Sequence, residues 1–228
     1  MPNKFTDFIT KMLDAVNPPP VTSTLPATVS HSWGSVLTPT SVPDDAKKVL
    51  SVRPTISITN VSTFITDDQL KKMRDAGISW VPTFTPVQEQ VDHADVMGWT
   101  GETLANLKKI LENHARSLQK AIALGVNVLV GSDSGSCGVA HGTGLIREME
   151  LLENAGMPTL DILCQATHGN NSLLTNRQPY GSLEKDFKPR FILTKHNPLE
   201  TVKNLYLDRL VLFDGEVQDT STLVAENL

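Results

Sequence analysis

Asp133 is the residue of this sequence whose type and position best suit chemistry. An apolar, β-type run at 126–130 leads directly into the segment Gly-Ser-Asp-Ser-Gly, and the histidine follows Asp133 by eight residues. In a parallel α/β protein the carboxyl ends of the strands face the site. A carboxylate that directly follows a strand is therefore well placed for proton transfer. We predict Asp133 as the first functional residue of the chain.

The loop around Asp133 allows two other interpretations. The carboxylate can bond backbone amides of its own turn, as aspartate and serine side chains commonly do. The flanking serines can also belong to a Gly/Ser loop that cradles a phosphate group before a helix. No lysine stands at P-loop spacing, so the phosphate interpretation has little further support. The serines concerned are Ser132, Ser134 and Ser136.

The elements that would position this loop follow an alternating pattern, in which short apolar runs are separated by helical patterns. Strands are expected at 36–37, 56–58, 78–81 and 126–130, and helices at 43–52, 66–76 and 100–124. Strands that alternate with helices form parallel sheets with crossover helices. The sequence therefore predicts an α/β fold.

Local signals strengthen several of these helices. A capping-box pattern begins at Thr66, ahead of the helix expected at 66–76, and Gly77 suits the left-handed residue that ends it. Beyond the Asp133 loop, the apolar spacing predicts a helix at 145–155 and a second one that begins near Thr159.

The character of the chain changes near residue 190, where short apolar β-type runs replace the helical patterns. Asp214-Gly215 stands between two of these runs and is a strong hairpin signal. We therefore predict three parts: an N-terminal helical segment at 1–34, the α/β part at 35–188 and a small antiparallel β appendage at 189–228.

Composition narrows the classes of partner. The chain has 228 residues, a formal charge of -5 and a pI near 5.7, without a basic stripe for nucleic acid or anionic membranes. Its two cysteines are too few for a disulfide framework, and the N-terminus lacks the apolar core of a signal peptide. No stretch approaches the roughly 18 apolar residues of a membrane helix. We expect a cytoplasmic protein that acts on a small molecule, without nucleic-acid or membrane partners.

A series of motifs runs through the chain from about residue 60 onwards. They are Trp80-Val81-Pro82-Thr83, Gly131-Ser132-Asp133, Ala140-His141-Gly142, Glu148 to Met157, Gln165-Ala166-Thr167, Gly181-Ser182-Leu183 and Asn197-Pro198-Leu199. In these motifs the chain resembles the metal-dependent amidohydrolase superfamily, in particular its imidazolonepropionase-like and prolidase-like members. The resemblance extends over most of residues 35–217. It implies a partial (β/α)8 TIM-type barrel of about four βα units, formed by the last strands of the barrel.

The resemblance also implies a mechanism. In this family an aspartate on the last barrel strand binds the metal and accepts a proton from the attacking water, and Asp133 matches that aspartate. His141 matches a position near the substrate mouth, where it would bind the substrate. The alternative is that His141 forms hydrogen bonds as a neighbour of the N-cap of the helix expected at 142–155. The implied cofactor is a divalent metal, zinc above all, which lowers the pKa of a bound water to about 7. The implied activity is hydrolysis of a C–N bond in a cyclic amide, an amidine or a dipeptide-like substrate.

The chain departs from the family pattern where other metal ligands are expected. Residues 36–40 read Val-Leu-Thr-Pro-Thr, without the histidine of the fifth strand, and Thr59-Asn60 replaces the histidine region of the sixth. No His-x-His strand lies upstream. Three explanations fit: a truncated amidohydrolase, a catalytically inactive remnant that binds a partner or forms a homo-oligomer, or a subunit that completes its barrel with another chain.

Other titratable residues are weaker candidates. A charged cluster after the strand at 78–81 can supply replacement metal ligands, but such runs are more often solvated loop. His114 stands in a charged helical stretch, and we expect it on a solvated helix face rather than in a site. The residues of the charged cluster are Glu89, Asp92, His93 and Asp95.

Overall fold

The computed structural model describes residues 57–59, 65–172 and 180–218. The strand expected at 36–37, the helix expected at 43–52 and the N-terminal helical segment lie outside these residues. Within the described ranges, no helix combines the length and the apolar character needed to cross a lipid bilayer.

A short parallel sheet carries the candidate site. Strand β1 (Ser57–Thr59) pairs in parallel with β2 (Ser79–Val81). On the other side of β2, Trp80 forms a parallel bridge to Val128, so the strand expected at 126–130 is reduced to a single bridge. The three segments are neighbours in sequence order and run in one direction, so their carboxyl ends share one edge. The α/β prediction is confirmed, and this order is consistent with part of a barrel.

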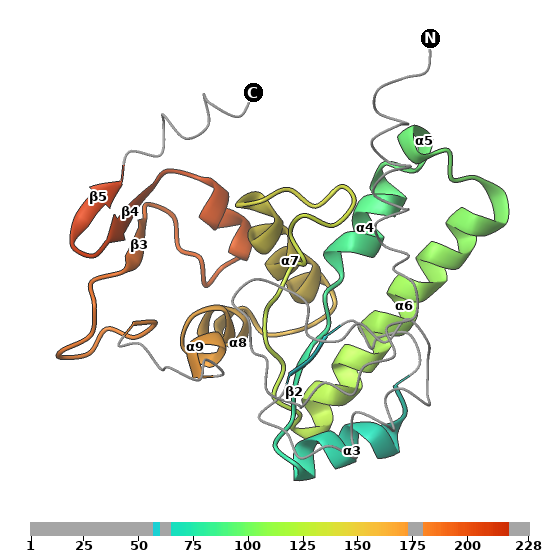
Figure 1. Ribbon diagram of the computed structural model, residues 1–228, viewed down its shortest axis with the longest axis horizontal. Helices are drawn as coiled ribbons and strands as arrows, with labels where there is room; N and C mark the ends of the chain where they lie inside the picture. Colours follow the sequence, from blue (N-terminus) through green and yellow to red (C-terminus); the bar gives the residue numbers. More distant parts are fainter. Residues whose placement is uncertain (1–56, 60–64, 173–179, 219–228) are drawn as a thin grey trace, which may run out of the picture. The chain divides into compact units, whose positions relative to one another are not determined.

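The connections between these segments are helical at the predicted places. Helix α3 (Asp67–Asp75) leads to β2, and the long helix α6 (Gly101–Leu124) leads to the Val128 segment (Figure 1). Thr66 caps α3 through the predicted capping box: its backbone N–H donates to Gln69 Oε1 at 2.8 Å, and its hydroxyl accepts the Gln69 N–H at 3.3 Å. Local capping signals thus placed this helix correctly.

The segment between β2 and α6 differs from the prediction. It forms α4 (Thr85–Asp92) and α5 (Ala94–Met97), not the solvated loop expected from its charges. Pro86 lies in the first turn of α4, where the missing proline N–H costs no helical hydrogen bond. Glu89 and Asp92 therefore project from a helix, which fixes their spacing.

Helices also follow the Asp133 loop, as predicted. They are α7 (Thr143–Asn154) and α8 (Thr159–Cys164), and α8 continues through a π-helical turn η1 (Gln165–Gly169) into the short α9 (Asn170–Ser172). The side-chain amide of Asn170 donates to the carbonyl of Val130 at 2.7 Å. This bond ties the end of that helical run to the chain just before the Asp133 loop.

The hydrophobic core lies between the parallel segments and the helices that cover them. Its apolar members come from α3, β2, α6, α7 and α8, so these elements share one core. Complete burial of a side chain of this size stabilises the fold by about 1.5–3 kcal/mol. Fully or almost fully buried members include Leu70, Met73, Ile78, Trp80, Leu118, Leu152 and Ile162.

The predicted antiparallel β element near the C-terminus is confirmed. Strands β3 (Phe191–Thr194), β4 (Arg209–Phe213) and β5 (Glu216–Gln218) form a three-stranded sheet in this order, orange to red in Figure 1. Asp214 and Gly215 join β4 to β5 with φ values of 53° and 89°. Two consecutive positive φ values are the geometry that the Asp-Gly hairpin signal predicts.

Glu153 joins α7 to two later parts of the chain. Its carboxylate accepts bonds from the hydroxyls of Thr159 and Thr201, each at 2.8 Å, and from the backbone N–H of Val202 at 3.2 Å. Val202 is fully buried and begins the 3-10 turn η2 (Val202–Tyr206). The bonds to Thr201 and Val202 hold this turn against the core.

We expect Glu153→Ala to lower the free energy of unfolding by about 2 kcal/mol, because a buried backbone donor and two hydroxyls lose their acceptor. Urea unfolding at neutral pH measures the change. Glu112→Ala on the exposed side of α6 is the control and should change the stability by less than about 0.5 kcal/mol. A similarly small change for Glu153→Ala would mean that water replaces its bonds without loss.

Candidate active site

Two residues with left-handed backbone lie at the carboxyl edge of the parallel sheet. Thr83, just after β2, has a φ of 57°, and Asp133 has a φ of 54°. Non-glycine residues rarely adopt this conformation, and those that do are often found at functional sites. We call this edge, residues 83–85 and 131–135, the rim.

The two halves of the rim lie close together. The bridge between Trp80 and Val128 places the two segments side by side three residues before Thr83 and Gly131. A Cβ added to Gly131 would lie 2.7 Å from Cγ1 of Val81. Only glycine allows so close an approach, so the end of β2 packs directly against the start of the Asp133 loop.

The Asp133 loop is closed by its backbone and its serines. The carbonyl of Asp133 accepts the N–H of Ser136 at 3.0 Å, and the hydroxyls of Ser132 and Ser134 bond each other at 2.8 Å. The Asp133 side chain is exposed, and among the described residues no group donates a hydrogen bond to its carboxylate. The turn thus uses the backbone of Asp133 and leaves its carboxylate available for other contacts.

The structure brings His141 to this loop. Its side chain is exposed, and a Cβ added to Gly135 would lie 3.3 Å from Nε2 of the His141 ring. His141 immediately precedes Gly142, the N-cap residue of α7. The imidazole therefore lies beside the loop that carries Asp133.

The described residues do not by themselves fit a catalytic zinc. Such a centre normally needs three protein ligands and an open position, and no group of three histidine, cysteine or carboxylate side chains within 57–59, 65–172 and 180–218 lies close enough together to hold a metal ion. Asp133, even together with the His141 ring beside its loop, gives fewer than three such side chains among the described residues. The charged cluster does not replace the missing ligands, because two of its carboxylates already have a cationic partner.

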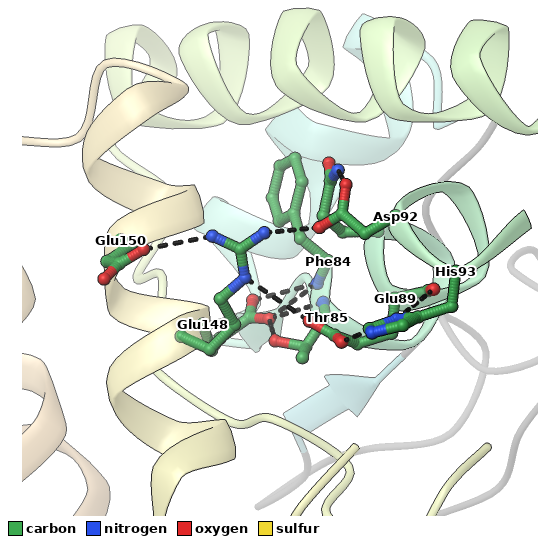
Figure 2. A network of polar contacts seen from close by, with 9 residues as sticks. Phe84, Thr85, Glu89, Asp92, His93, Glu148 and Glu150 are labelled. Atoms are coloured by element: carbon green, nitrogen blue, oxygen red, sulfur yellow. Dashed lines mark hydrogen bonds and ion pairs between the residues drawn. The ribbon is translucent and has the colours of Figure 1, made fainter. Parts of the chain in front are cut away.

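That partner is Arg147 of α7. Its guanidinium bonds Asp92 at 2.6 Å and Glu89 at 3.3 Å, both on α4, and Glu150 at 3.0 Å within α7. Figure 2 shows these ion pairs. The Glu89 carboxylate also lies 3.4 Å from the His93 ring. The metal-ligand interpretation of this cluster is therefore wrong for the described residues: the cluster is an ion-pair network that fixes α4 on α7.

Glu148 makes a second, fully buried link between the same helices. Its side chain is 0% exposed. Its carboxylate accepts the N–H of Phe84 at 2.8 and 2.9 Å, the N–H of Thr85 at 2.8 Å and the Thr85 hydroxyl at 2.6 Å (Figure 2). Burial raises the pKa of Glu148 to about 7, and the three donors oppose this shift. This carboxylate caps α4 at the point where it leaves the rim.

The expectation for His114 is wrong. Its side chain is 1% exposed and stacks on Phe84, with ring centroids 4.2 Å apart, while the Trp80 ring lies 6.1 Å away. Burial lowers the pKa of His114 to about 3, and the backbone carbonyl of Pro82 opposes this shift. Among the described residues neither ring nitrogen has a hydrogen-bonding partner of normal geometry. His114 is thus a neutral core residue beneath the rim.

The chain has similar solved structures but no matching family model. No protein-family model matches the chain, and neither does any curated protein. Among solved structures, the chain is similar to a putative prolidase from Bifidobacterium longum, with 23% identity and a TM-score of 0.67 over 81% of this chain. A Xaa-Pro dipeptidase with bound methionine matches at 23% identity and a TM-score of 0.65 over 77% of this chain. Part of this chain therefore has the fold that these structures share.

The similarity covers only part of those proteins. The chain spans 49% of the prolidase and 42% of the dipeptidase. An A. niger ochratoxinase matches at 23% identity and a TM-score of 0.58, over 71% of this chain and 36% of its own. This chain therefore corresponds to less than half of each of these structures.

Glu148 and His114 carry signals that the sequence analysis did not use. His114 shares its helix face with Leu118 and Ala121, three or four positions apart along α6, and this is the spacing of residues that face a core. Glu148 likewise precedes Leu152 by one helical turn of α7. A titratable residue within an apolar stripe indicates burial. Both residues contact Phe84, His114 from α6 and Glu148 from α7.

Proposed function

We propose that this chain provides part of the active site of an amidohydrolase-type hydrolase, which cleaves a C–N bond in a cyclic amide, amidine or dipeptide-like substrate. One observation carries the proposal: an exposed, unpaired carboxylate, Asp133, lies at the carboxyl edge of the parallel segments with His141 beside its loop. This is the edge on which such folds carry their chemistry. The enzymes among the similar structures support this proposal over a non-catalytic binding protein.

In the proposed reaction Asp133 accepts a proton from water as the water oxygen adds to the carbonyl or amidine carbon. The C–N bond then breaks, and the proton passes from Asp133 to the leaving nitrogen, so that Asp133 returns to its ionised form. His141 binds an oxygen of the substrate and holds it over the rim. The exposed position of both side chains supports these roles.

The proposed cofactor is a divalent metal, zinc, whose chemistry would be the activation of water. Asp133 would be one of its ligands, and the remaining ligands would come from outside the described residues. Since the chain spans less than half of the similar structures, those ligands can belong to residues outside the described ranges or to a second copy of this chain.

The test uses purified full-length chain, with and without added zinc, and a panel of methionyl-proline, an N-acyl amino acid and a hydantoin. Asp133→Asn keeps the shape of the side chain and removes the base, and it should lower kcat by about 100-fold or more. Asp161→Asn is the control, because Asp161 is exposed on α8 away from the rim. Elemental analysis on the same samples measures zinc. No hydrolysis of any substrate together with no bound zinc would contradict the proposal.

His141→Ala should raise KM by about tenfold and change kcat little, because the lost contact holds the substrate equally in the ground state and the transition state. Steady-state kinetics on whichever panel substrate is cleaved measures both constants. His93→Ala, which removes an exposed histidine from the end of α4, is the matched control. An equal loss of kcat and kcat/KM would instead make His141 a participant in the chemical step.

A further inference from the structure

Thr83 holds an unfavourable backbone conformation that needs an explanation. Its φ of 57° is left-handed, although threonine is β-branched, and its side chain is only 4% exposed. Such a conformation is costly and persists only where the surrounding structure enforces it. Its own hydroxyl contributes one weak bond, to the carbonyl of Val81 at 3.5 Å. The main constraint must therefore come from the neighbours of Thr83.

Glu148 constrains the two residues that follow Thr83. Its carboxylate takes both backbone N–H groups of Phe84 and Thr85 and the Thr85 hydroxyl, all at 2.9 Å or less. These bonds connect positions 63 and 64 residues apart in sequence, from α7 to the rim. On its other side, the Phe84 ring is stacked on His114. The chain leaving Thr83 is thus fixed in both position and direction.

We infer that Glu148 is a positioning residue for the rim: by holding Phe84 and Thr85 it keeps Thr83 left-handed beside the Asp133 loop. The contact between Val81 and Gly131 passes this geometry to the Asp133 loop, because the end of β2 packs directly against Gly131. The inference rests on the proposed function only where it takes the rim as the substrate-binding edge. Glu148 itself touches no exposed part of the rim, so it acts through the backbone.

The inference predicts an interaction between two substitutions that are far apart in sequence. Glycine adopts left-handed backbone without steric cost, so Thr83→Gly removes the need for the constraint. Glu148→Ala should therefore disturb the Asp133 loop in the presence of Thr83 and much less in the presence of Thr83→Gly. If the Glu148 carboxylate served only as a helix cap, Glu148→Ala would disturb the Asp133 loop equally with Thr83 and with Thr83→Gly.

The experiment is amide hydrogen exchange followed by NMR on the full chain at pH 7. The probe is the Gly135 amide, which donates to the Val139 carbonyl at 3.0 Å within the Asp133 loop. Its rate is compared with that of the Leu118 amide in the core, which corrects for global unfolding. Glu148→Ala should accelerate Gly135 exchange relative to Leu118 by about tenfold or more, and by less than about threefold in the Thr83→Gly background.

Glu150→Ala is the matched control, since it removes a buried carboxylate from the same helix that bonds Arg147 and not the rim. It should change the Gly135 rate by less than about twofold. If Glu148→Ala does not fold, Glu148→Asp replaces it, because the shorter side chain keeps a carboxylate that cannot reach both amides. Equal acceleration in both Thr83 backgrounds, or none, overturns the inference. The readout needs neither substrate nor metal, so an inactive preparation does not affect it.

Discussion

His114→Leu will make the protein more stable than the unsubstituted chain at acidic pH, and its advantage will increase as the pH falls. The leucine fills the space between the Trp80 and Phe84 rings without burying a polar atom. At pH 7 the two proteins should differ by about 1 kcal/mol or less in the free energy of unfolding, because the histidine is then neutral in both the folded and unfolded states.

The increase of this stability difference at acidic pH follows from the pKa values of His114 in the folded and unfolded chain. Burial lowers the pKa of His114 to about 3 in the folded protein, against 6.5 for an ordinary histidine. The stability that depends on the neutral ring is therefore complete above pH 6.5 and is lost as the pH falls towards 3, because the unfolded chain takes up the proton first. The loss is about 1.4 kcal/mol per pH unit in this window, so the variant should gain about 2 kcal/mol by pH 5.

Urea unfolding at pH 7, 6 and 5 measures this gain. His93→Leu is the control, because the His93 side chain is 54% exposed and does not lie in the core. A His114→Leu difference that does not change between pH 7 and pH 5 would mean that the folded protein accommodates the imidazolium, for example by opening the core to water.

The parts of the fold that the sequence predicted are those with local causes. The capping box at Thr66 and the Asp214-Gly215 hairpin each depend on a few neighbouring residues, and both are present in the structure. The Asp133 loop was located because a short apolar run ends in a polar turn. His141 was assigned to the substrate mouth only through the family resemblance, and the structure places its ring beside Gly135.

The parts that the sequence did not predict have distant causes. Helix α4 looked like a charged loop because the cation that pairs with its carboxylates, Arg147, lies more than 50 residues later. The end of β2 is fixed by Glu148, which is equally remote. Periodicity can show that Glu148 faces inwards, but not which backbone amides it meets. Tertiary contacts of this kind cannot be read from a local pattern.

Glu148→Gln will show the opposite pH dependence to His114→Leu. Burial raises the pKa of Glu148 to about 7 in the folded protein, against 4.5 for an ordinary glutamate. Its favourable contribution is therefore present below pH 4.5 and is lost as the pH rises through 7, because the unfolded chain releases the proton first. Glutamine does not titrate, so the variant should gain up to about 3 kcal/mol over the unsubstituted chain between pH 4.5 and pH 7.5.

At pH 4.5 the same variant should be the less stable protein by about 1 kcal/mol, because its amide NH₂ cannot accept the N–H of Phe84. Urea unfolding at pH 4.5, 6 and 7.5 measures the change, and Glu112→Gln corrects for the loss of one surface charge.

The pH ranges in which His114 and Glu148 affect stability overlap between pH 4.5 and 6.5. In this range their opposite effects on the free energy of unfolding cancel in the unsubstituted protein. In each single variant the free energy of unfolding should change with pH as the remaining residue, His114 or Glu148, dictates. In the double variant it should again change little between pH 4.5 and 6.5. A Glu148→Gln difference that stays constant with pH would mean that the three donors outweigh burial and keep the carboxylate ionised.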